Sequence, residues 1–410
     1  MRDRTLAAVT QAPHGRTMMG GEPLVFHCNF YNYFLQKTLL LDESLGMEAV
    51  IRDAGASSAY ALLTTAAARV HADTPEARRA LASDTFSELG FGRITLDEVR
   101  ADGGLARVPV SHYGTCLRAA AGAPFARPQS YFDAGYAAAA AAVIHGLPGD
   151  ALVGQLEACQ SMGAPVGRVR LRRRETTLFR SPGQGAHRED ATVPPPFADT
   201  RVDEAGVLAS LATLNFSGNE EGLIPRFGVM LTRHFANFYN RVSFEFLRRM
   251  AGSGLEEAAE SLLVEAGYRC AFHTFGGIMV SPEWDAVVRP QCERWEDWVC
   301  GIVAIVNAFG WGVWRVHALA PDRLVLRIWD DYESCGYVGM YGRAARPVSF
   351  LATGGAVGIM NLIRVGDIHE QPELDRDFYV RIFESADAFR ATTTRSMARG
   401  DEFTEIVVAR

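Results

Sequence analysis

The tetrapeptide Asn-Phe-Tyr-Asn occurs twice in this chain, at residues 29–32 and 237–240, and a histidine lies shortly before each copy. Other segments of the two halves match in the same order. They are 53–61 with 265–273, 89–96 with 309–316, 108–113 with 326–332, 132–138 with 350–356, and 159–163 with 396–400. Each match alone is weak, but matches that keep one order along a chain indicate a duplicated structural unit. We therefore expect two copies of one module.

The length of 410 residues supports this division. A single hydrophobic core stops growing at roughly 250–300 residues, so about two domains are expected. Residues 180–200 concentrate Pro, Gly and charge without periodicity, which is typical of a linker or surface loop. The predicted parts are an N-terminal extension (1–23), a first domain (24–174), a linker with a lead-in helix (175–222) and a second domain (223–410).

The two copies share one coarse secondary structure. A helix carries each Asn-Phe-Tyr-Asn string, and His27 and Tyr31 stack on one face of the first of them. Gly55 and Gly267 are predicted C-caps of the helices that follow. Gly-x-Gly turns then lead into alternating runs that indicate paired antiparallel strands. Further helices are predicted at 45–54, 75–88 and 134–145, and at 255–266 and 290–308. The predicted fold class is α+β, with two tandem copies of a small antiparallel sheet covered by helices.

Composition narrows the function classes. The net charge of -7 and the absence of zinc-finger or other nucleic-acid motifs argue against a DNA or RNA partner. The sequence has no uncharged apolar run of about 18 residues and no signal-peptide core, so neither a membrane partner nor secretion is expected. Seven cysteines without CxxC pairs fit reduced, buried thiols. We expect a cytoplasmic protein.

The sequence also resembles a known family. Residues 90–96, 108–113, 131–148 and 159–171, together with 310–334, resemble the 4-vinyl reductase domain. This ligand-binding module is seen in bacteriochlorophyll-synthesis proteins and phenol-sensing regulators, so the resemblance implies a bacterial protein. It also implies a fold like that of the nitric-oxide-sensor and Golgi-transport proteins, with a hydrophobic pocket between sheet and helices. The resemblance covers roughly 24–174 and 223–410.

The chain departs from this family at the positions of its structural zinc site. Only Cys159, with Glu157 nearby, remains of the ligand set that the resemblance implies. The corresponding positions otherwise hold Ser130, Tyr131, Val166 and Gly167 in the first copy and Ser396 and Thr404 in the second. One thiol cannot supply the four ligands of a tetrahedral zinc. We expect this zinc site to be lost from both copies.

Polar residues at matching places suggest contacts to a ligand. Asparagine is a poor residue inside a helix, so its repeated presence beside a histidine and aromatic rings needs a reason. One reason is capping and hydrogen bonding within the core, and the other is orientation of a polar group on a bound molecule. The candidate ligand-binding residues are His27, Asn29 and Tyr31 in the first copy and His234, Asn237, Tyr239, His273, Trp311 and Trp329 in the second.

The leading interpretation is a binding, sensing or accessory protein for a small apolar or aromatic molecule. A separate protein partner or a homodimer would carry any signal. No cofactor is predicted, because the sequence lacks a dinucleotide fingerprint and an iron–sulfur cysteine cluster, and a self-contained reductase is therefore not expected.

Two other interpretations stay open. The first is an enzyme of catabolic or natural-product metabolism with an acid/base or transition-metal site in the second domain. That site would use His234, Cys270, His273 and Asp330, with the neighbouring carboxylates. The second is a structural scaffold or dimerisation subunit.

Overall fold

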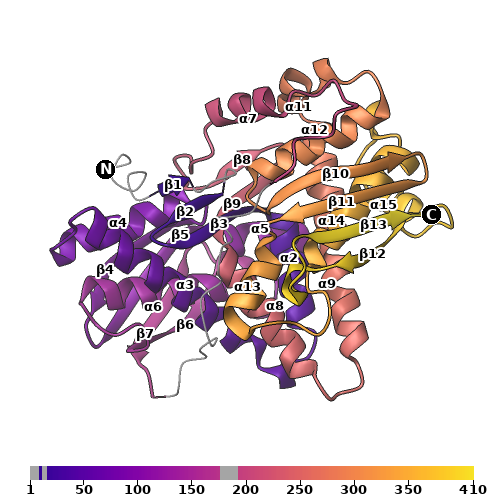
Figure 1. Cartoon of the computed structure of the whole chain (residues 1–410). Helices are drawn as coiled ribbons and strands as arrows, with labels where there is room; N and C mark the ends of the chain where they lie inside the picture. The colour runs from indigo at the N-terminus through magenta and orange to yellow at the C-terminus, as the bar shows by residue number, and fades with distance from the viewer. Residues whose placement is uncertain (1–8, 12–15, 176–192) are drawn as a thin grey trace.

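The computed structural model describes residues 9–11, 16–175 and 193–410 (Figure 1). The first half contains β1 (Val9–Gln11), β2 (Thr17–Met19), β3 (Glu22–Cys28), α2 (Asn29–Leu39), α3 (Met47–Arg69), α4 (Pro75–Glu88), β4 (Gly92–Arg100), β5 (Gly103–Ser111), α5 (His112–Ala121), α6 (Tyr131–Ile144), β6 (Leu152–Ala158) and β7 (Gly167–Arg173). The second half contains α7 (Glu204–Thr213), β8 (Ile224–Arg226), β9 (Val229–Phe235), α8 (Ala236–Met250), α9 (Glu256–Cys270), α10 (Gly276–Met279), α11 (Pro282–Val287), α12 (Trp295–Ala308), β10 (Val313–Ala320), β11 (Arg323–Trp329), α13 (Tyr332–Tyr341), α14 (Phe350–Met360), α15 (Arg376–Phe383), β12 (Arg390–Arg395) and β13 (Thr404–Ala409).

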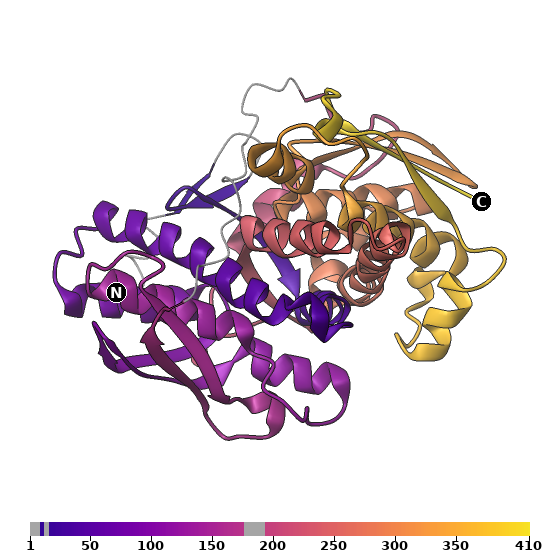
Figure 2. The same ribbon diagram turned by 90° about the horizontal axis from the view of Figure 1, so that it is seen from below.

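The predicted α+β fold class is confirmed. One four-stranded antiparallel sheet has the order β4-β5-β7-β6, and the other has the equivalent order β10-β11-β13-β12. Helices α6 and α14 pack against these sheets, and α3 and α9 pack against the outer sides of α6 and α14. Figure 2 shows the two units beside each other, the first in indigo to magenta and the second from pink through orange to yellow.

A third sheet, which was not predicted, joins the halves. Its order is β1-β2-β3-β9-β8, so a hairpin from each half contributes to it. Strands β3 and β9 pair antiparallel, with Val25 opposite His234 and His27 opposite Thr232. The prediction that the first helix includes His27 is therefore wrong, because His27 and His234 lie in strands and the helices begin just after them.

Gly55 and Gly267 are not C-caps, which corrects a second prediction. Each lies inside a longer helix, α3 or α9, where that helix crosses α6 or α14. A Cβ on Gly135 of α6 would lie 2.0 Å from the carbonyl oxygen of Arg52, and one on Gly354 of α14 would lie 2.5 Å from that of Val264. These glycines allow the two helices of each pair to approach closely.

The same contacts correct one match between the copies. Pairing 132–138 with 350–356 places Gly135 opposite Thr353. In the structure, Gly135 and Gly354 hold the equivalent position, because each faces the backbone of the preceding long helix. The repeat at this point is therefore shifted by one residue.

Candidate functional site

The two strands β3 and β9 carry each half's histidine into the other half. The backbone N–H of Phe26 donates to the carbonyl oxygen of Phe309 at 2.9 Å, and the indole of Trp311 donates to the carbonyl oxygen of Phe26 at 2.9 Å. In the reciprocal contact, the backbone N–H of Arg233 donates to the carbonyl oxygen of Leu89 at 2.9 Å. The contacts of β3 with the second half and of β9 with the first half are therefore approximately symmetric. Each histidine lies against the Gly-x-Gly turn of the other copy.

Around these histidines lies a buried set of rings, here called the central cluster. Its members are His27, Tyr31, Tyr113, His234, Tyr239, Trp311 and Tyr332. The Tyr113 hydroxyl lies 3.0 Å from Nε2 of His234, and the Tyr332 hydroxyl lies 3.3 Å from Nε2 of His27. Burial holds the pKa of both histidines well below its usual range, so they are neutral near pH 7.

Five of the predicted ligand-binding residues meet in this cluster: His27, Tyr31, His234, Tyr239 and Trp311. They are packed against one another, and the cavity that Tyr239 lines has a volume of only about 10 Å³. Such a volume is close to the lower limit for a single water molecule. This cavity beside the central cluster is therefore too small for an organic ligand.

The predicted asparagines hold protein groups. The side-chain oxygen of Asn29 accepts from the backbone N–H of Met230 at 3.0 Å. The side-chain nitrogen of Asn237 donates to Oε2 of Glu22 at 3.0 Å. Both contacts fasten one half to the other, which matches the structural reason considered for these residues.

His273 and Trp329 lie apart from the central cluster. The His273 ring stacks on Phe30, with centroids 3.8 Å apart. Trp329 packs with Val313 and Phe403 in a separate small cluster. These two residues therefore do not share a site with the five predicted residues of the central cluster.

The residues of the metal alternative do not converge. Cys270 shares the Thr274 hydroxyl with Cys28. Asp330 forms an ion pair with Arg16 at 2.9 Å, while His234 contacts Tyr113. Within residues 16–175 and 193–410, no group of three or more His, Cys, Asp or Glu side chains is placed to hold a metal ion.

Ser396 and Thr404, which were compared with zinc ligands of the 4-vinyl reductase domain, carry hydrogen-bonded hydroxyl groups. In the second half, the hydroxyls of Ser349 and Thr404 donate to Oδ2 of Asp331, and Ser334 lies within 3.4 Å of Ser396. In the first half, Cys159 lies 2.8 Å from the Ser161 hydroxyl. Glu157, which was considered beside Cys159, forms an ion pair with Arg170 instead.

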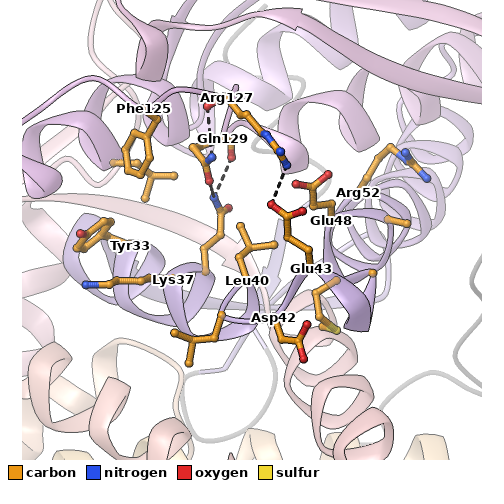
Figure 3. Close-up of a pocket in the computed structure, with 16 residues that line it drawn as sticks. Tyr33, Lys37, Leu40, Asp42, Glu43, Glu48, Arg52, Phe125, Arg127 and Gln129 are labelled. Carbon is orange, nitrogen blue, oxygen red and sulfur yellow. Dashed lines mark hydrogen bonds and ion pairs between the residues drawn. The ribbon is translucent and has the colours of Figure 1, made fainter.

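The first half also contains a large groove, here called the first-half groove. It has a volume of about 630 Å³ and lies between α2, the start of α3, α5 and the loop before α6 (Figure 3). Its apolar and aromatic lining comes from Tyr33, Leu40, Leu117 and Phe125. Pockets of 300–1,000 Å³ with such a lining are the usual size for small organic ligands.

Charged side chains surround this groove in balanced numbers. Lys37, Arg52 and Arg127 line it, and so do Asp42, Glu43 and Glu48. Figure 3 shows the ion pair between Arg127 and Glu43, whose atoms lie 2.8 Å apart. Both side chains are well exposed, so this ion pair contributes little stability and can open.

Gln36 is the buried polar residue of the groove and is only 5% exposed. Its Nε2 donates to the carbonyl oxygen of Gln129 at 2.9 Å. Its Oε1 is buried and accepts no hydrogen bond from the described residues. An acceptor in this state is costly unless a donor reaches it.

Sequence reasoning missed this groove. A signal was present, because residues 126–128 and 345–347 both read Ala-Arg-Pro, and in the first copy this loop forms one wall. The glutamine and the half-buried rings stand in no recognisable motif. Only the folded arrangement of α2 against the loop brings them together.

No protein-family model matches the sequence, and no curated protein matches it. Among solved structures, the phenol-responsive sensory domain of the transcription activator PoxR, determined with phenol, is similar to this chain with a TM-score of 0.38 and 12% identity. The match covers 52% of this chain and 91% of that domain. None of the helices in the described part is long and apolar enough to cross a membrane.

Proposed function

We propose that this chain binds a small, neutral molecule with an aromatic or largely apolar body. It serves as a binding, sensing or accessory protein built from two 4-vinyl-reductase-like units. The observation that carries the proposal is the first-half groove, which combines a suitable volume with an aromatic lining. The central cluster, where five of the predicted residues meet, is packed, so we place the ligand in the groove.

The charges of the groove support a neutral ligand. Three cationic and three anionic side chains line it, so neither sign of charge is left to attract an ion. Tyr33 and Phe125 supply ring surfaces against which an aromatic body can pack. The unmet acceptor of Gln36 favours a ligand that carries a hydroxyl or amine donor. A phenol has this combination of features.

Isothermal titration calorimetry on the full chain tests the proposal. Phenol and toluene have similar rings, but only phenol can donate to Gln36, so we expect phenol to bind more tightly. Gln36→Leu should weaken phenol binding about tenfold, which is the effect of losing one hydrogen bond of about 1.4 kcal/mol. Gln155→Leu, on an exposed strand position far from the groove in sequence, is the matched control and should bind as wild type. The proposal is contradicted if phenol does not bind to the wild type, or if Gln36→Leu and Gln155→Leu bind phenol equally tightly.

A further inference from the structure

The duplication places a second cavity at the corresponding position of the second half. The loop that contains Ala-Arg-Pro at 126–128 forms a wall of the first-half groove, and its repeat at 345–347 forms a wall of this cavity. The other walls come from α8 and α13, which are the counterparts of α2 and α5. Its volume is about 250 Å³. We call it the second-half cavity.

We propose that the second-half cavity is a binding site for a neutral, single-ring aromatic molecule that carries a hydrogen-bond acceptor. This inference goes beyond the function proposed for the first-half groove. It requires neither that groove nor its ligand, since the residues that carry it belong to the second half alone.

The lining of the second-half cavity is mainly aromatic. Phe244 of α8 meets Tyr337 of α13 edge to face, with centroids 5.0 Å apart and planes at 83°. The Tyr337 and Tyr341 rings lie 5.2 Å apart. Leu247 and Val348 complete the apolar surface. Rings at these separations give edges and faces for a further ring, and the small volume limits the ligand to one.

The charged residues of the second-half cavity already have protein partners. Arg248 forms an ion pair with Glu245 at 2.7 Å, and Arg346 forms one with Glu260 at 3.4 Å. A charged ligand would have to separate one of these pairs or remain unpaired beside apolar rings. The cavity therefore favours a neutral molecule.

One buried polar atom in the described lining lacks a protein partner. The Tyr341 hydroxyl is buried and makes no hydrogen bond with the described residues. Burial raises the pKa of Tyr341 to about 12, so the hydroxyl keeps its proton at neutral pH and can donate. A ligand acceptor such as a carbonyl oxygen would satisfy it. The first-half groove differs, because Gln36 offers an acceptor there.

Fluorine NMR with 4-fluoroacetophenone and 4-fluoroethylbenzene as probes tests this site in the full chain. The two probes have similar rings, but only the first has a carbonyl acceptor. We expect 4-fluoroacetophenone to bind the wild type and to bind about tenfold more weakly to Tyr341→Phe, since one hydrogen bond is lost. 4-Fluoroethylbenzene should bind both proteins alike, which shows in the same experiment that the cavity is intact in the variant.

Tyr60→Phe is the matched control, because it makes the same chemical change outside both cavities. It should leave 4-fluoroacetophenone binding unchanged. The inference is overturned if this probe does not bind, if Tyr341→Phe binds it as tightly as wild type, or if Tyr60→Phe weakens its binding as much as Tyr341→Phe does. Phenol calorimetry is a separate measurement, so either proposal can fail alone.

Discussion

Asp133 is a fully buried carboxyl group in the core of the first half. Its Oδ2 accepts from the Ser111 hydroxyl at 2.5 Å, while its Oδ1 has no partner among the described residues. Burial raises the pKa of Asp133 to about 7, and the hydrogen bonds from Ser111 and Ser130 offset only part of this rise. Below about pH 7 the carboxyl group therefore keeps its proton in the folded state, and a neutral oxygen without a partner costs less than an ionised one.

This pKa gives a pH prediction with a definite sign. Between about pH 4 and pH 7 the unfolded chain has lost the Asp133 proton and the folded chain retains it, so the group's stabilising contribution is lost as pH rises. Asp133→Asn should remove this loss, and its free energy of unfolding relative to wild type should rise by roughly 3 kcal/mol from pH 5 to pH 8. Urea unfolding at both pH values measures the difference. Asp97→Asn, at an exposed position, is the control. If the free energy of unfolding of Asp133→Asn changes with pH as much as that of wild type, the raised pKa of Asp133 is refuted.

Helix α2 connects the first-half groove to the second half of the chain. Tyr33 and Gln36 line the groove. One turn earlier, the side-chain oxygen of Asn32 accepts from the Tyr239 hydroxyl at 2.6 Å, and Phe30 stacks on His273. A ligand that shifts α2 therefore acts directly on contacts between the halves.

Tryptophan fluorescence can detect this connection. All six tryptophans lie in the second half, between Trp284 and Trp329, and none lines the first-half groove. Saturating phenol should change the emission, because Trp311 contacts His27 and the backbone of β3 just before α2. Trp311→Phe should remove most of the change while calorimetry shows unchanged binding, and Trp295→Phe should retain it. Bound phenol with no spectral change in wild type would rule out the connection.

Elements were predictable where a local pattern decides them. The helix at 75–88 matches α4, which begins with Pro75 after the Thr74 cap. Gly55 and Gly267 misled the prediction, because a glycine before a break and a glycine at a helix crossing look alike in sequence. Of the residues predicted to bind a ligand, two histidines, two tyrosines and Trp311 did converge, whereas His273 did not. Whether a convergent group leaves an open volume depends on packing that no local pattern records.

Across the whole molecule, the duplication predicted the two equivalent sheets and their helices. It did not predict that the hairpins β2–β3 and β8–β9 would join in a sheet shared by both halves, since pairing between distant strands leaves no local signature. The predicted boundaries at 24–174 and 223–410 remain a prediction. Because β3 packs on the second half and β9 on the first, each half completes part of the core of the other.

The location of the ligand is the claim on which the proposed function depends. A crystal structure of the full chain with 4-iodophenol would show it directly, because anomalous scattering identifies the iodine without reference to any prior structure. We predict an iodine peak in the first-half groove, between Tyr33 and Phe125. An iodine peak only inside the central cluster, or no bound iodophenol in that groove, would contradict the account.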